Sequence, residues 1–112
     1  MNNKPLVWLD GEVKTPPFSR EARLKAGFLL RELQGGELIA MPDSRPMPGI
    51  GKHCHELRVN DRESGKTWRI VYKIYTDAIV ILEIFAKKTN QTPKNIIDVC
   101  KLRIKQYDEV TK

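Results

Sequence analysis

Three β-type runs between residues 53 and 93 constrain the fold of this chain more than any other feature. The runs cover 55–60, 67–75 and 79–86, and the breaks between them fall at residues 60–65 and at Thr76-Asp77. This spacing is typical of consecutive β-hairpins. The third run is almost continuously apolar, with Glu83 as its one interruption, as expected for a strand covered on both faces. We therefore expect a mostly antiparallel sheet at the centre of the fold.

The flanking segments predict a further strand and two helices. The apolar residues 6–9 favour a short strand, and the proline- and glycine-rich segment 37–52 favours an irregular connection. A helix is expected over 20–34, capped by Ser19 and ended by Gly35-Gly36. A second helix is expected over 93–107, with Thr92 as its capping residue. The fold class is therefore small α+β, a mostly antiparallel sheet flanked by helices.

Length and composition are those of one soluble domain spanning 1–112. The chain is 40% hydrophobic and 30% charged, and it holds no apolar run long enough to cross a bilayer. Its start lacks a signal-peptide core, which predicts a cytoplasmic protein without a membrane partner. The two cysteines, Cys54 and Cys100, are expected to be reduced and partly buried.

Positive charge is concentrated in the second half of the chain. Residues 1–51 hold seven Lys and Arg against six Asp and Glu, whereas residues 52–112 hold thirteen against eight. A basic half indicates a polyanionic partner, although a solvated basic surface has the same composition. Charge alone therefore leaves nucleic acid as one of two interpretations.

Several familiar chemistries find no support in the sequence. Phosphate-cradling GxxxxGK[ST], HExxH and CxxC motifs are all missing. His53-Cys54-His55 has metal-ligand residue types, but on a strand Cys54 points away from both histidines. The same alternation separates the thiol from a histidine base. We therefore expect neither a metal site nor a cofactor.

Basic residues on the strands leave metal-free RNA cleavage as a candidate chemistry. This reaction needs a base for the ribose 2′-hydroxyl, cations for the charge developing on phosphorus, and an acid for the departing 5′-oxygen. The strands and their ends supply cations at Arg58, Arg69, Lys73, Lys87 and Lys88. A tyrosine, a histidine such as His53 or His55, or a perturbed lysine could transfer protons. Plain nucleic-acid or protein binding remains the other interpretation.

Nearly the whole chain resembles the phage-derived, HigB-type branch of the RelE/ParE toxin superfamily. The resemblance is carried by CHELRV, TWRIVYKI and AIVILEIFAKKTNQTP in this order, preceded by TPPFS and SRPMPGIG. It implies a small sheet flanked by helices and a type II toxin neutralised by a helix-turn-helix antitoxin. For HigB-type and RelE-type members it implies metal-independent endoribonuclease cleavage of messenger RNA on the ribosome, which inhibits translation.

The resemblance assigns catalytic roles to Arg58, Arg69 and Lys87. The two arginines bind phosphate and stabilise transition-state charge, and Lys87 joins them or transfers a proton. RNA binding is assigned to Lys52, Lys73 and Lys88. The superfamily also implies two alternatives, a ParE-like gyrase inhibitor and an inactive phage-derived binding module. The tyrosine or histidine that RelE-type enzymes often place near the C-terminus is not matched, because Tyr107 lies on the apolar stripe of the last helix.

Overall fold

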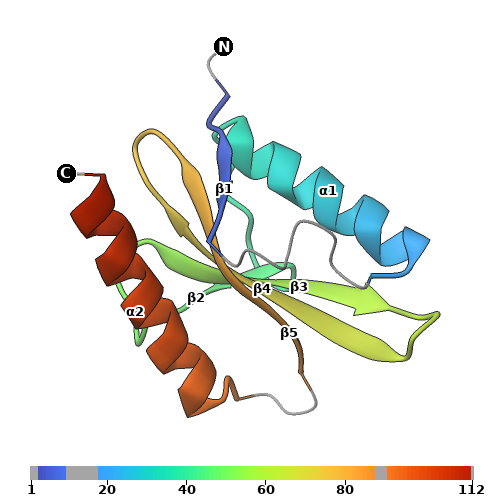
Figure 1. Cartoon of the computed structure of the whole chain (residues 1–112). Coiled ribbons are helices and arrows are strands. Elements are labelled where there is room, and N and C mark those ends of the chain that lie inside the picture. Colours follow the sequence, from blue (N-terminus) through green and yellow to red (C-terminus); the bar gives the residue numbers. More distant parts are fainter. Residues whose placement is uncertain (1–2, 10–17, 88–90, 112) are drawn as a thin grey trace.

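The structure is a computed structural model that describes residues 3–9, 18–87 and 91–111. Five strands and two helices form a small α+β fold (Figure 1). In chain order the elements are β1 (Leu6–Trp8), α1 (Arg20–Gln34), β2 (Ser44–Pro46), β3 (Cys54–Asp61), β4 (Lys66–Ile74), β5 (Ile79–Lys87) and α2 (Lys94–Val110). The three predicted runs of the central region are thus β3, β4 and β5.

The sheet is mixed, so the prediction of a mostly antiparallel sheet is wrong. Its strand order is β1-β5-β4-β3-β2, and β1 pairs with β5 in parallel, with Leu6 opposite Ile79. The other neighbours are antiparallel. Side-chain periodicity identifies a strand but carries no information on its direction, which explains the error. β2 was also missed, because its proline argues against a strand except at a sheet edge, which is where β2 lies.

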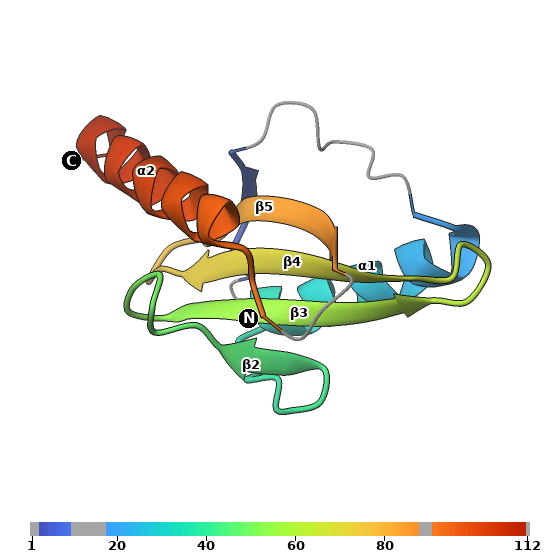
Figure 2. The same ribbon diagram turned by 90° about the horizontal axis from the view of Figure 1, so that it is seen from below.

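The two helices cover opposite faces of the sheet (Figures 1 and 2). Buried residues of α1 pack with Leu57, Ile70 and Tyr72, whereas Cys100 of α2 packs with Val71 and Val80. Neighbouring residues of β4 thus enter different clusters, as the period-2 pattern predicts. The predicted apolar stripe of α1 is confirmed as buried and consists of Ala22, Ala26, Leu29, Leu30 and Leu33.

The predicted start of α1 is confirmed, and that of α2 is wrong. Ser19 caps α1, since its hydroxyl accepts a hydrogen bond from the amide of Ala22 at 3.2 Å. The N-cap of α2 is Pro93, and no side chain caps that helix. The hydroxyl of Thr92 is instead bound to Glu56 on β3, so a tertiary contact has replaced the local cap.

A bulge in β5 is the point at which a polar side chain of α2 contacts the sheet. Val71 pairs with Glu83 and Tyr72 with Ile81, which leaves Leu82 as an extra residue in β5. Such a bulge changes which side chains reach each face. Arg103 of α2 donates to the carbonyl of Leu82 and to the carboxylate of Glu83. α2 is therefore held against β5 by a polar contact in addition to its apolar stripe.

Within the described residues, neither helix combines the length and the apolar character that crossing a membrane requires.

Candidate functional site

Strand register brings charged residues of β2, β3 and β4 together on the face of the sheet that α2 partly covers. Arg45 of β2 is opposite Glu56 of β3, and Arg58 of β3 is opposite Arg69 of β4. Glu56 and Arg58 are two residues apart on one strand, so their side chains share a face. We call Arg45, Glu56, Arg58, Arg69 and Thr92 the arginine cluster. It contains three guanidinium groups and one carboxylate and therefore carries two net positive charges.

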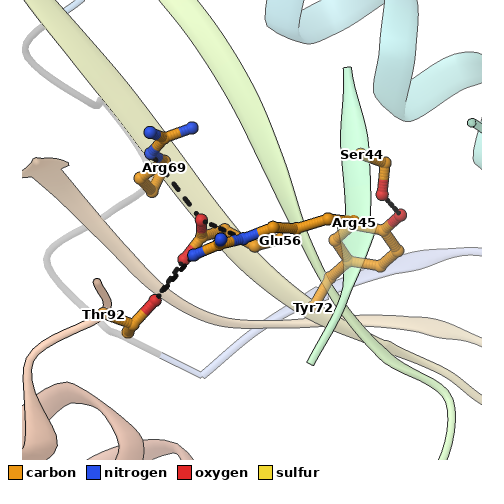
Figure 3. Close-up of polar contacts among 6 residues, drawn as sticks. All are labelled: Ser44, Arg45, Glu56, Arg69, Tyr72 and Thr92. Atoms are coloured by element: carbon orange, nitrogen blue, oxygen red, sulfur yellow. Dashed lines mark hydrogen bonds and ion pairs between the residues drawn. The ribbon is translucent and has the colours of Figure 1, made fainter. Parts of the chain in front are cut away.

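The carboxylate of Glu56 is the centre of the cluster, and its side chain is 1% exposed. Its Oε1 lies 3.3 Å from Nε of Arg45 and 3.6 Å from Nε of Arg69 (Figure 3). Its Oε2 accepts a hydrogen bond of 2.8 Å from the hydroxyl of Thr92. That hydroxyl in turn accepts one of 3.4 Å from Nη2 of Arg45. Glu56 thereby connects three strands with the segment that leads into α2.

Arg69 is a buried cation whose charge is incompletely matched. It is 5% exposed, and its Nε has no hydrogen-bond partner among the described residues. Burial lowers the pKa of Arg69, Arg58 and Arg45 lower it further, and the charge of Glu56 opposes these effects. In Figure 3 the two terminal nitrogens of Arg69 lie on the side of the guanidinium away from Glu56. The terminal nitrogens of Arg69 therefore lie outside its ion pair with Glu56.

Arg58 places a second positive charge directly across from Arg69. The amide of Arg58 donates to the carbonyl of Asp43, away from β4, so Arg58 and Arg69 form a non-hydrogen-bonded pair. In such pairs the Cα atoms are about 4.5 Å apart, the closer of the two antiparallel spacings. Like charges in this position are destabilising. Two arginines whose Cα atoms are this close can both reach one phosphate, with up to two hydrogen bonds from each guanidinium fork.

Three of the four predicted lysines have their backbone within the described residues. Lys87 ends β5 opposite Thr67, two residues beyond Phe85, which is opposite Arg69. Register therefore brings the backbone of Lys87 near the arginine cluster, while its side chain, like all of Lys88, lies outside the described residues.

The remaining two lysines, Lys52 and Lys73, lie away from the arginine cluster. The ammonium group of Lys73 lies 5.0 Å from the ring centroid of Tyr75, and four strand residues, or about 13 Å, separate Lys73 from Arg69. Lys52 is exposed in the turn before β3. The structure thus brings Arg58 and Arg69 together but not Lys52 and Lys73 with them.

Three of the four histidine and tyrosine candidates for proton transfer are held in contacts away from the arginine cluster. His55 stacks on Tyr72 on the α1 face, with ring centroids 5.5 Å apart, and burial lowers its pKa. Tyr72 is buried and bonded to the hydroxyl of Ser44 at 2.7 Å. Tyr107 packs against Tyr75. His53 is exposed in the turn next to Lys52.

Three members of the arginine cluster were not predicted as site residues. The sequence places Arg45 in an irregular connection from which it could reach a phosphate, Glu56 at a polar strand position, and Thr92 at a helix cap. Strand alternation in HELR predicts that Glu56 shares a face with Arg58, but it does not predict that Glu56 is buried. Its contact with Arg45 depended on the unpredicted strand β2.

A family model with the description Phage derived protein Gp49-like (DUF891) matches residues 17–105. The match covers most of the chain, including α1, the strands β2 to β5 and most of α2. This chain therefore belongs to the phage-derived Gp49-like family. Comparisons with curated proteins and with solved structures found no match.

Proposed function

We propose that this chain is the toxin of a type II toxin-antitoxin system and cleaves messenger RNA on the ribosome without a metal ion. The observation that carries the proposal is the Arg58–Arg69 pair, in which a buried cation faces a second cation across two strands. Such a pair costs stability in the free protein and gains a partner when a phosphodiester binds. The resemblance to HigB-type toxins and membership of a phage-derived family support the same function.

In this mechanism the arginines act on the phosphate. The ribose 2′-oxygen attacks the adjacent phosphorus as a base removes its proton, and the bond to the 5′-oxygen breaks as that oxygen is protonated. The products are a 2′,3′-cyclic phosphate and a 5′-hydroxyl. Arg58 and Arg69 would neutralise the charge that grows on the non-bridging oxygens. Lys87 would belong to the same cluster or transfer a proton, while Lys52, Lys73 and Lys88 would bind the RNA backbone.

The partner in this proposal is a helix-turn-helix antitoxin encoded beside the toxin. An antitoxin that places acidic residues on the arginine cluster would match its charge and occupy the position of the phosphate. A complex that left Arg58 and Arg69 exposed would indicate inhibition from a different surface.

Induced expression of wild-type protein tests the function in cells. We expect growth and translation to stop and transcripts to be cut, and Arg58→Met to relieve all three effects. Arg62→Met is the matched control, because Arg62 is an exposed cation in the turn after β3 and is not opposite Arg69. Uncut transcripts together with reduced DNA supercoiling would instead identify a gyrase inhibitor. Normal growth would indicate an inactive binding module.

A further inference from the structure

We propose that Glu56 is a positioning residue that orients Arg69 toward the bound phosphodiester. This inference rests on the proposed function and deepens it, because it assigns a task to the acidic member of a site that binds an anion. Glu56 is a buried carboxylate among the cations of the arginine cluster. A carboxylate repels phosphate, so it weakens the binding of RNA unless it does something else.

The carboxylate of Glu56 contacts the inner side of two guanidinium groups. Glu56 contacts the inner nitrogen, Nε, of Arg45 and of Arg69 through the same oxygen, at 3.3 and 3.6 Å. Charge-assisted hydrogen bonds in a tight pair are about 2.7–2.9 Å, and a full pairing uses two nitrogens of one arginine. The contact to Arg69 is an ion pair without a hydrogen bond, so Glu56 attracts the inner side of the Arg69 guanidinium while the terminal nitrogens lie on the far side (Figure 3).

Thr92 holds the carboxylate itself in place. It donates to Oε2 at 2.8 Å, which leaves Oε1 facing the two arginines. Thr92 precedes α2, and α2 is fastened to β5 through Arg103. The direction of Arg69 is therefore set by contacts that extend from Glu56 through Thr92 to a helix packed on the sheet. This support fulfils the requirement that a catalytic cation be held rigidly before the substrate arrives.

Two substitutions at Glu56 separate the effect of its charge from the effect of its side-chain length. Glu56→Gln keeps the size and removes the negative charge, whereas Glu56→Asp keeps the charge and shortens the side chain by about 1.5 Å, one carbon–carbon bond. Thr92→Val removes the hydroxyl and leaves the charge of the cluster unchanged. The readouts are kcat on ribosome-bound messenger RNA, Kd for an oligonucleotide with a 2′-deoxy residue at the cleavage position, and the urea midpoint.

We expect Glu56→Gln to bind the uncleavable RNA about threefold or more tightly at low salt, because the cluster loses its negative charge. Its kcat should fall at least tenfold, since Arg69 is no longer held. Glu56→Asp should lose kcat to a similar extent with Kd within about twofold, and Thr92→Val should lose several-fold in kcat alone. Opposite changes in binding and cleavage cannot come from a loss of folding.

The inference is overturned if the folded variants keep kcat within about twofold of wild type, or if kcat, RNA affinity and urea midpoint fall in proportion. Should both Glu56 variants fail to fold, Thr92→Val decides between these outcomes. If the wild-type protein cleaves no RNA, the proposed function fails, and the ¹⁵N resonance of Arg69 Nε still tests the positioning. Glu56→Asp should shift that resonance, and an unchanged resonance would refute the role of Glu56.

Discussion

Replacing Arg58 with methionine should make the protein more stable and less active. Arg58 is half-buried and lies directly opposite Arg69, so two like charges occupy the closely spaced kind of antiparallel pair. Methionine keeps much of the apolar stem of arginine and removes the charge. The substitution therefore relieves the repulsion without opening a large cavity, which alanine would do.

The expected gain follows from the strand geometry. A cross-strand pair changes the free energy of unfolding by about 0.2–1 kcal/mol, and a like-charge pair lowers it. Relief of that term should raise the free energy of unfolding by the same amount. For a chain of this length about 1 kcal/mol corresponds to about 4 °C in Tm, so we expect an increase of about 1–4 °C. The increase should shrink only in part in about 1 M salt, because buried and partly buried charges are screened much less than exposed ones.

Urea and thermal unfolding of wild type, Arg58→Met and Arg62→Met measure this effect. The Arg62 variant loses the same charge from an exposed turn and should leave Tm nearly unchanged. In a binding assay with single-stranded RNA, the loss of one phosphate contact should reduce the slope of log K against log salt by about 0.7. The reasoning is refuted if Arg58→Met unfolds more easily than Arg62→Met.

Three further outcomes follow from buried polar groups. Arg69→Ala should lower the free energy of unfolding by about 1–3 kcal/mol, measured by urea titration, because it opens a cavity and removes one of the cations paired with Glu56. Hydrogen bonds from the hydroxyl and the amide of Ser19 and from the indole of Trp68 hold the pKa of Asp61 below its usual value. Its stabilisation is therefore complete above the unfolded-state pKa of about 3.9 and is lost as the pH falls below it. Asp61→Asn should flatten the decline of the urea midpoint between about pH 5 and pH 2, whereas Asn at the exposed position Asp77 should not. Burial raises the pKa of Cys100 to about 12, so iodoacetamide at about pH 8 should label this thiol in urea but not in the native protein, as read by mass spectrometry.

The sequence predicted the elements of this fold better than their arrangement. Periodicity located α1 and the β3–β5 runs because each has an apolar face that a period of 3.6 or 2 makes visible. The direction of β1 and the existence of β2 depend on which edge each short strand joins, and short strands leave little trace in a periodic pattern. Thr92 was assigned to a cap because the sequence shows its neighbour Pro93 but not Glu56, which is 36 residues away in the chain.

The sequence predicted the cations of the candidate site but not the residues that contact them. Arg58 and Arg69 follow from strand alternation and from the resemblance, and the β3–β4 register brings them together. That Arg69 is buried could not be read from a strand position that looked solvated. Its burial changes how a mutation should be designed, because removing Arg69 disturbs folding and function together, whereas removing the charge of Arg58 separates them.

Cleavage of ribosome-bound messenger RNA by purified protein tests the central claim most directly. In the presence of a metal chelator we expect wild type and Arg62→Met to cut the transcript at rates within about threefold of each other, and Arg58→Met to be slower by about 100-fold, the loss typical of removing one transition-state donor. The cut ends should carry 2′,3′-cyclic phosphate and 5′-hydroxyl groups. Intact transcripts with wild-type protein, or equal rates for wild type and Arg58→Met, would contradict the assignment of RNA cleavage to the arginine pair.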